Sequence, residues 1–444
     1  MQKILATLLQ TKTMMPSSIA QAANADMLLT LLFWKLLSDW YQGKASRFQQ
    51  HYHQPDTYIQ ATLAANHLRF SESTLYGAIH WDRPERACLA LRESLYRWHH
   101  LQSQPSLYDI LRPERFGQMS PHYPFLSHSN VLADVIRLIG GMSFTHLKPA
   151  LTIGEVFSRA LAILQADEPT LHPLLVQFML DVLQPLPTDR IYDPACGTGQ
   201  LLLACACDMV QRVPRHQMVL VGQEARLNHW ALAKMQLISH GLTLHQLTHT
   251  DALDKPESGI KGMLGLSRIN VVLTYLPGDK QDWKYAAAKN DRRFPAKPPK
   301  EASLALIWHG LAQLQHEHAR MSVILPLCLL EGSEGFALRR HVVEQHHLEA
   351  VIELPRQLGQ GKLLGMLVLR KHHIVNTAAF ISGNTMLSPE LANQQELDLD
   401  VLLQAYRAYR HRQNRAGLYM IENTTLARHA YSFDLPTYVP RVAA

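Results

Sequence analysis

The sequence predicts an α/β protein: a doubly wound, largely parallel sheet with helical segments before and after it. Short apolar runs alternate with stretches of helical length from about residue 187 onward, which indicates strand–helix–strand units. Of the 444 residues, 47% are hydrophobic and 18% charged, which excludes a disordered or coiled-coil chain. We expect a helical domain over residues 1–145, the α/β core over 146–384 and a helical tail over 385–444.

The N-terminal part is predicted to be helical from its apolar pattern. Residues 25–42 (ADMLLTLLFWKLLSDWYQ) carry apolar side chains all round, as in a helix buried among others. Residues 151–165 and 172–184 have heptad-like apolar spacing and predict two further helices. The most apolar stretch, residues 27–34, is far shorter than the roughly 20 residues of a membrane span, and no signal-peptide pattern opens the chain. We therefore expect a cytoplasmic protein with no membrane partner.

The core elements follow one another in a regular order. The predicted strands are, in order, RIYD, MVLVGQEA, LHQLTHTDAL, INVVLTYLP, MSVILPL, HLEAVIELP and KLLGMLVLRK. The predicted helices between them are QLLLAC, RLNHWALAKMQLISHGL, SLALIWHGLAQLQHEHA and FALRRHVVEQ, and LDVLLQAYRAYRHRQ is a polar helix of the tail. In such sheets ligands bind at the carboxyl ends of the strands, here beside the first loop.

Composition narrows the class of protein. The 43 Lys and Arg against 37 Asp and Glu give a formal net charge of +6, which is compatible with a nucleic-acid partner. The five cysteines are irregularly spaced and form no Cys-x-x-Cys, which excludes a disulfide scaffold and disfavours structural zinc. The 25 histidines form no His-Glu-x-x-His pattern, so we expect no metal site.

The DPACGTG loop after the first strand is the candidate ligand site. Gly197 and Gly199 let the backbone turn tightly and approach a ligand closely. A dinucleotide fingerprint has a third glycine where this chain has Leu202, which disfavours a pyrophosphate cradle. Three strands end instead in carboxylates: Asp193, Glu224 and Asp251. Such acids suit a ligand with ammonium and sulfonium charges, and S-adenosylmethionine is one.

Two of the acids have a predicted partner on this ligand. A carboxylate at the end of the second strand, Glu224, can accept hydrogen bonds from both ribose hydroxyls, and Asp251 can accept one from the adenine amino group. The predicted cofactor-binding residues are Asp193, Pro194, Ala195, Cys196, Gly197, Thr198, Gly199, Glu224 and Asp251. A generic nucleotide-binding α/β domain is the alternative.

Longer segments resemble one family. DPACGTG together with QEARLNHWALAKMQLISHGL resembles the first two motifs of DNA adenine methyltransferases, particularly the modification subunit of type I restriction-modification systems. NDRRFPAKPPKEASLALIWHGLAQL, SVILPLCLLEGSEGFALRRHVVEQHHLEAVIELP and LLGMLVLRK are similar to later blocks of that subunit, and YSFDLPTYV resembles its closing segment. The resemblance implies a Rossmann-like, S-adenosylmethionine-dependent core that binds double-stranded DNA. It also implies a specificity subunit and a second copy of the chain as partners.

The catalytic position departs from this family. There a strand ends in Asn-Pro-Pro followed by Phe or Tyr. The Asn side chain and the first Pro carbonyl accept hydrogen bonds from the target amino group, and the aromatic ring stacks on the flipped-out base. The same four positions here are Tyr275, Leu276, Pro277 and Gly278.

Each departure removes a function. Tyr275 carries its oxygen on a rigid ring that would occupy the base pocket, and Leu276 lacks the fixed φ of proline. Gly278 offers no surface on which the base could stack, and such stacking contributes roughly 1–3 kcal/mol to binding. Of an upstream cofactor block only Glu168 and Pro173 match, in DEPTLHP. We therefore expect catalysis to be impaired or lost.

The segment DKQDWKYAAAKNDRRFPAKPPK, after the altered motif, is the most basic of the chain. Its cations would neutralise DNA phosphates beside the catalytic face; a solvated surface loop is the alternative. The predicted DNA contacts are Lys284, Lys289, Arg292, Arg293, Lys297 and Lys300. Two rival hypotheses remain open: an active adenine-N6 methyltransferase with a variant motif, and a non-catalytic assembly protein of a defence complex.

Overall fold

The structure is a computed structural model whose described residues form two compact units. Unit 1 is Met1–Pro169 with Leu227–Thr243, and unit 2 is Thr170–Arg226 with Leu244–Ala444. The expected boundaries at residues 145 and 385 stay a prediction about domains. The described residues are 2–52, 70–101, 110, 126–145, 152–165, 170–213, 218–242, 245–255, 269–278, 283–286, 288–295, 297–314, 316–359, 361–383 and 399–438.

Unit 1 is helical. The long apolar run within α2 is buried on all sides, from Leu28 to Leu37, as its pattern predicts. Trp34 of this helix stacks on Trp98 with ring centroids 5.2 Å apart, and its indole N–H donates to the Thr74 carbonyl (2.8 Å). The helices are α1 (Gln2–Met14), α2 (Gln21–Tyr52), α4 (Ala87–Leu101), α6 (Ser129–Gly140), α7 (Ile153–Leu164) and α10 (Leu227–Ser239).

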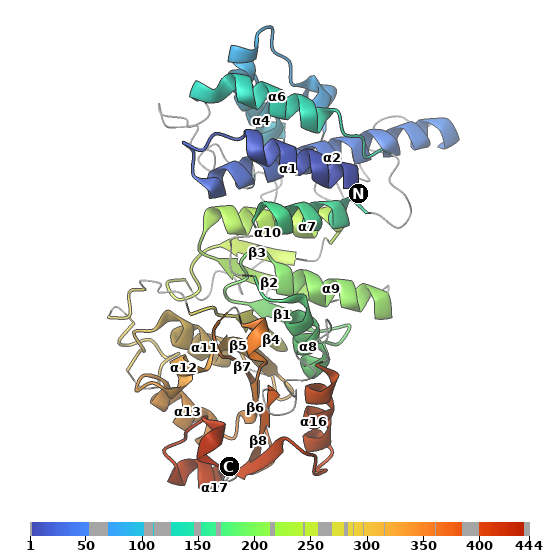
Figure 1. The fold of residues 1–444 in the computed structure, drawn as a ribbon. Helices are drawn as coiled ribbons and strands as arrows, with labels where there is room; N and C mark the ends of the chain where they lie inside the picture. The colour runs from blue at the N-terminus through green and yellow to red at the C-terminus, as the bar shows by residue number, and fades with distance from the viewer. Residues whose placement is uncertain are drawn as a thin grey trace. The chain divides into compact units, whose positions relative to one another are not determined.

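Unit 2 is built on a nine-stranded sheet of order β3-β2-β1-β4-β5-β7-β6-β8-β9 (Figure 1). β1 to β5 are parallel to their neighbours in this set, whereas β7 is antiparallel to β5 and β6, and β9 is antiparallel to β8. The strands are β1 (Arg190–Asp193), β2 (Val219–Glu224), β3 (His245–His249), β4 (Val271–Tyr275), β5 (Arg320–Pro326), β6 (Leu348–Glu353), β7 (Leu364–Arg370), β8 (Thr377–Ser382) and β9 (Leu418–Glu422). The predicted strands are all present, and β8 and β9 are additions.

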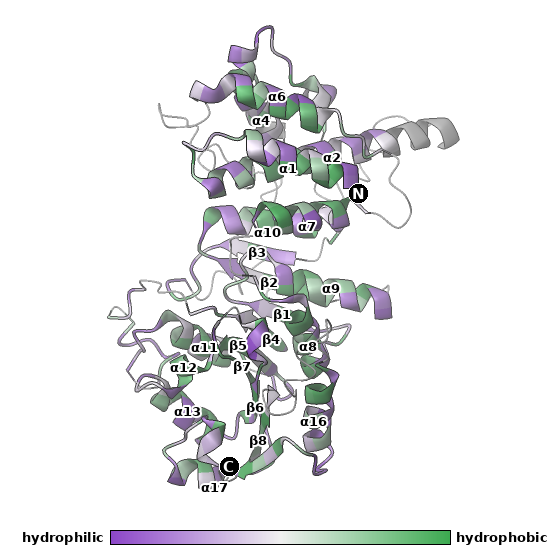
Figure 2. Ribbon diagram, viewed as in Figure 1, coloured by the Kyte–Doolittle hydropathy of each residue, from purple (hydrophilic) through white to green (hydrophobic). Residues whose placement is uncertain are grey.

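Helices cover both faces of this sheet, which confirms the doubly wound α/β class. α9 packs on β1 and β2, α8 on β5 and α16 on β8, and these three lie on one side; α11, α12 and α13 lie on the other (Figure 1). Strand β8 is largely apolar, as a covered strand must be, while the exposed end of α9 is polar (Figure 2). The helices are α8 (Pro173–Leu183), α9 (Gln200–Arg212), α11 (Ala302–Gln313), α12 (Leu327–Glu331), α13 (Gly335–Glu344), α16 (Asp400–Arg410) and α17 (Asn423–Arg428).

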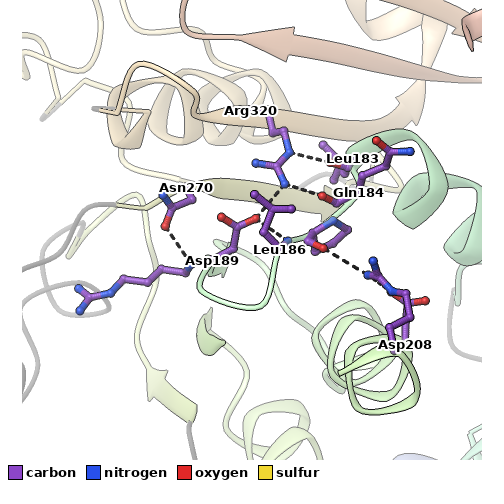
Figure 3. Close-up of polar contacts among 10 residues, drawn as sticks. Leu183, Gln184, Leu186, Asp189, Asp208, Asn270 and Arg320 are labelled. Atoms are coloured by element: carbon purple, nitrogen blue, oxygen red, sulfur yellow. Dashed lines mark hydrogen bonds and ion pairs between the residues drawn. The ribbon is translucent and has the colours of Figure 1, made fainter. Parts of the chain in front are cut away.

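A buried arginine fixes the amino-terminal edge of the central strands (Figure 3). Arg320, the first residue of β5, donates to the carbonyls of Leu183 (2.6 Å) and Gln184 (2.7 Å), where α8 ends. It also pairs with Asp189 at 2.8 Å, and Asp189 accepts a further hydrogen bond from the Leu186 N–H (2.8 Å). The guanidinium thus satisfies helix-end carbonyls that have no partner within α8 and joins α8, β1 and β5.

Candidate functional site at the carboxyl ends of the central strands

The site lies where the order of the strands reverses. β1 is bonded to both β2 and β4, and the chain builds the sheet outward from β1 in one direction and from β4 in the other. Crevices at such switch points are where doubly wound sheets bind ligands. At this point lies what we call the cradle, which consists of Asp193–Gly199, Glu224 and Asp251.

The loop of the cradle depends on two glycines. Gly197 (φ +55°) and Gly199 (φ +82°) have left-handed backbones, which strain other residues. A side chain at Gly197 would meet no atom within 4 Å, so the space beside it is open. The Cys196 N–H donates to the Gln223 carbonyl (2.9 Å), and this bond ties the loop to β2. Pro194 and Cys196 are buried, whereas Ala195 and Thr198 are partly exposed.

Glu224 holds the loop from the end of β2. Its Oε2 accepts a hydrogen bond from the Gly197 N–H (3.0 Å) and its Oε1 accepts one from the Arg226 N–H (2.8 Å). Oε1 also pairs with Arg226 Nε at 3.4 Å, so the second acceptor position of Oε2 is the one left for a ligand hydroxyl while Glu224 still holds the loop. Glu224 itself is 6% exposed.

The other two acids carry perturbed protonation equilibria. Asp193 is buried and accepts from the Ala195 N–H (3.0 Å). Burial and the charge of Glu224 raise the pKa of Asp193 to about 7, against lowering by Ala195 N–H and the Thr274 hydroxyl. Burial likewise raises the pKa of Asp251, whose Oδ1 accepts from the Leu253 N–H (2.8 Å). Closely spaced acids of raised pKa favour a ligand that brings positive charge.

The altered motif begins at the end of β4. Tyr275, the first residue of the motif and the last of β4, is partly buried. The Leu276 N–H donates to the Ile324 carbonyl (2.9 Å). The carbonyl of Pro277 is occupied by the Lys362 ammonium at 2.7 Å. Lys362 was not identified from the sequence, because its partner is 85 residues away.

Gly278 has a backbone conformation that strains any residue with a side chain. Its φ of +75° is left-handed, and a Cβ there would lie 3.1 Å from Leu329 Cδ1 and 3.2 Å from Pro326 Cγ. A cavity of about 450 Å³ opens at Gly278 instead, and Phe380 and Phe433 are among the residues that line it. Gly278 therefore carries no side chain at this cavity, whereas two phenylalanine rings contribute to its lining.

The basic segment presents most of its predicted contacts to solvent, and its aromatic residues anchor it. Trp283 and Phe294 are buried with ring centroids 5.7 Å apart, and the Trp283 indole donates to the Lys300 carbonyl (3.1 Å). The predicted DNA contacts whose side chains are exposed are Lys284, Lys289, Arg292, Lys297 and Lys300.

Arg293 differs from this expectation. Its side chain is 9% exposed and pairs with Asp291 at 2.6 Å. It also donates to the carbonyls of Ala252 (2.9 Å) and Leu253 (2.6 Å) and to His309 Nδ1 (2.9 Å). Burial alone would raise the pKa of Asp291, yet Arg293 holds it below the usual value. Because these partners occupy the donors of Arg293 inside the protein, Arg293 is not available for the predicted phosphate contact.

Three buried polar residues behind the cradle were also not identified from the sequence: Tyr192, Gln223 and His309. One signal was present, since His309 is the only ionisable residue in the helical run LALIWHGL. Glu168 of the upstream block lies outside the described residues. Within the described ranges no three His, Cys, Asp or Glu side chains are placed to hold a metal ion. Among the described helices none is long and apolar enough to cross a membrane.

The chain is similar in sequence to known proteins. The chain is 25% identical over 253 residues to the type I restriction enzyme EcoEI methylase subunit of Escherichia coli, which covers 53% of this chain and 49% of that protein. It is 23% identical over 376 residues to the MjaVII methylase subunit of Methanocaldococcus jannaschii, with 77% and 60% covered. The chain thus spans about half the length of the curated relatives that it matches.

Solved structures show the same fold. The methyltransferase subunit of a type I restriction-modification system from Streptococcus thermophilus matches with a TM-score of 0.77 at 18% identity over 99% of both chains. A modification subunit of a type I restriction enzyme from Vibrio vulnificus matches with a TM-score of 0.66 at 15% identity, covering 95% of this chain and 92% of that one. The family pattern described as N-6 DNA Methylase matches residues 173–442. The chain therefore belongs to the N-6 DNA methylase family.

Proposed function

We propose that this protein is a type I modification-subunit homologue that binds S-adenosylmethionine in the cradle and DNA at the basic segment, with methyl transfer impaired or lost. One observation carries the proposal. Acids follow β1, β2 and β3 at one edge of the sheet around an open glycine loop, while the neighbouring strand β4 ends in Tyr275. The cradle thus retains its binding groups and the catalytic strand end does not.

The residues of the cradle fit the cofactor. S-adenosylmethionine supplies an activated methyl group on a sulfonium. Glu224 keeps an acceptor position on Oε2 for a ribose hydroxyl, and Asp251 is partly exposed for the adenine amino group. The raised pKa of Asp193 supports a role for this acid near positive charge, because a cation restores its ionised form.

Three features of the β4 end support loss of catalysis. Tyr275 replaces the amide that would accept a hydrogen bond from the target amino group. The Lys362 ammonium lies on the Pro277 carbonyl and so places a cation one residue from Leu276, whose carbonyl has the position of the family's accepting proline. The left-handed Gly278 has no stacking ring, and its neighbours leave a cavity there. Without an amide acceptor and a stacking ring, a bound base would be poorly positioned and its amino group would not be activated.

DNA binding rests on the exposed cations of the basic segment. Lys284, Lys289, Arg292, Lys297 and Lys300 are exposed. Such cations neutralise phosphates without reading sequence. Sequence recognition would come from a specificity subunit, with a second copy of the chain in the same assembly, since the relatives are named as subunits. A DNA partner of this kind supports a cytoplasmic location.

Calorimetry with S-adenosylmethionine tests the cofactor site. We expect the wild-type chain to bind the cofactor and Glu224→Gln to weaken binding about tenfold or more, because charged acceptors contribute roughly 1.5–3 kcal/mol per hydrogen bond. Glu317→Gln, at an exposed acid of the same unit, serves as the control and should bind like wild type. No binding at millimolar ligand would reject this proposal in favour of an assembly protein.

A further inference from the structure

Behind the cradle, four polar side chains form one continuous line of hydrogen bonds, which we call the Arg293 relay: Arg293, His309, Tyr192 and Gln223. Arg293 Nη1 donates to His309 Nδ1 (2.9 Å). An accepting Nδ1 leaves the ring proton on Nε2, which donates to the Tyr192 hydroxyl (2.7 Å). That hydroxyl in turn donates to Gln223 Oε1. Because a guanidinium only donates, the direction of every bond in the relay is fixed.

The relay is shielded from water. Tyr192, Gln223 and His309 are fully buried, and the Arg293 side chain is almost so. Burial, together with the charge of Arg293, lowers the pKa of His309 to about 3, so the imidazole is neutral at physiological pH. Burial keeps the Tyr192 phenol neutral as well by raising its pKa. Breaking one bond of such a network leaves buried polar atoms unpaired, which is costly at low dielectric.

The relay touches each strand end that bears an acid of the cradle. Tyr192 directly precedes Asp193, and Gln223 directly precedes Glu224. Gln223 Nε2 also donates to the Thr250 hydroxyl (2.9 Å), next to Asp251.

The other end of the relay lies in the basic segment. Arg293 also holds the carbonyls of Ala252 and Leu253, which follow Asp251. It stands between the exposed Arg292 and the buried anchor Phe294. Displacement of the segment would therefore unpair groups at the cradle.

We propose that Arg293 and His309 are positioning residues that couple the basic segment to the cradle, so that DNA on the segment raises the affinity of the cradle for S-adenosylmethionine. This inference rests on the proposed function, because it requires both ligands to bind. DNA that holds the segment in its place also holds the strand ends in theirs, through the hydrogen bonds of the relay. Linkage makes the effect reciprocal: bound cofactor raises the affinity for DNA by the same factor.

The test measures the dissociation constant of S-adenosylmethionine for the full chain, by calorimetry, with and without a saturating short DNA duplex. We expect DNA to tighten wild-type binding about fivefold or more, the lower end of typical coupling between sites. Tyr192→Phe removes the hydroxyl in the middle of the relay and keeps the ring. This variant should bind each ligand alone, yet the DNA effect should fall below about twofold. Arg293→Lys, which keeps the charge but not the planar fork, should behave alike.

The matched control is Tyr409→Phe. Tyr409 is also buried, and its hydroxyl contacts a histidine, His373 (2.9 Å), and the Thr377 carbonyl, at the β8 end of the sheet. Its loss should lower stability comparably and leave the DNA effect intact.

Three results would overturn the relay. They are binding of both ligands by wild type without coupling, full coupling in Tyr192→Phe, and equal loss of coupling in Tyr409→Phe. Absence of cofactor binding or of DNA binding in wild type would instead reject the proposed function, and this inference with it.

Discussion

Arg292→Ala and Arg293→Ala should have different consequences, although the two residues are adjacent and of the same type. Arg292 is exposed, whereas the Arg293 side chain is 9% exposed and donates to Asp291, His309 and two carbonyl oxygens. Arg293→Ala leaves these acceptors without their donor. Arg292→Ala removes only an exposed cation.

The size of the difference follows from these contacts. Removing one partner of a buried ion pair costs about 3–5 kcal/mol. Asp291 is 24% exposed and so partly rehydrated when its partner is lost, which favours the lower end, about 3 kcal/mol of unfolding free energy. Arg292→Ala should stay within about 0.5 kcal/mol of wild type, as exposed substitutions usually do.

Urea unfolding and DNA titration measure both sides of this contrast. Arg293→Ala should shift the urea midpoint strongly downward. Arg292→Ala should leave the midpoint unchanged and lower the slope of log affinity against log salt by about one. If Arg293→Ala is as stable as the wild-type protein, the role that we assign to the hydrogen bonds of Arg293 is refuted. An unchanged salt slope in Arg292→Ala would place the DNA interface elsewhere.

Three further predictions concern the buried Arg320–Asp189 pair, the altered motif and the cradle. Arg320→Met leaves the buried Asp189 unpaired and should cost about 3–5 kcal/mol in urea unfolding; a loss below about 1 kcal/mol would show that the pair is dispensable. Gly278→Phe forces a side chain onto a left-handed backbone and should cost roughly 1–2 kcal/mol, and a stabilised variant would contradict this geometry. The pKa of Asp193 is raised from 3.8 to about 7, so the folded state binds a proton more tightly than the unfolded chain. Its contribution to stability is therefore full below about pH 4 and is lost as the pH rises through 7. Asp193→Asn should remove this fall between about pH 4 and pH 7, and an unchanged pH profile of urea unfolding would show that Asp193 is not its source.

The sequence predicted the strands from β1 to β7 and the acids at their ends, because alternating apolar runs and a glycine loop are local patterns. β9 was not predicted, because its half-exposed residues become a strand only through pairing with β8, a contact between segments far apart in the chain. The buried state of Arg293 was equally hidden. Nothing local distinguishes it from Arg292, and its partner His309 is set by the packing of α11 against the sheet. The contact of Lys362 with Pro277 likewise depends on the tertiary fold.

Under the proposed function, this protein keeps the groups that bind its ligands and lacks, at the altered end of β4, the groups that catalyse methyl transfer. Tyr275, Leu276 and Gly278 change the groups that would activate the target amine, whereas the cradle keeps its acids and its left-handed glycines. A protein of this kind would respond to cofactor and DNA without modifying the base.

Methyl transfer from tritiated S-adenosylmethionine to duplex DNA tests this central claim most directly. The chain should retain bound label on the protein and transfer none to DNA above the protein-free background, alone or with a specificity subunit. Reproducible incorporation into DNA that disappears in Tyr275→Ala would contradict the account, since it would make the altered strand end a working catalytic site.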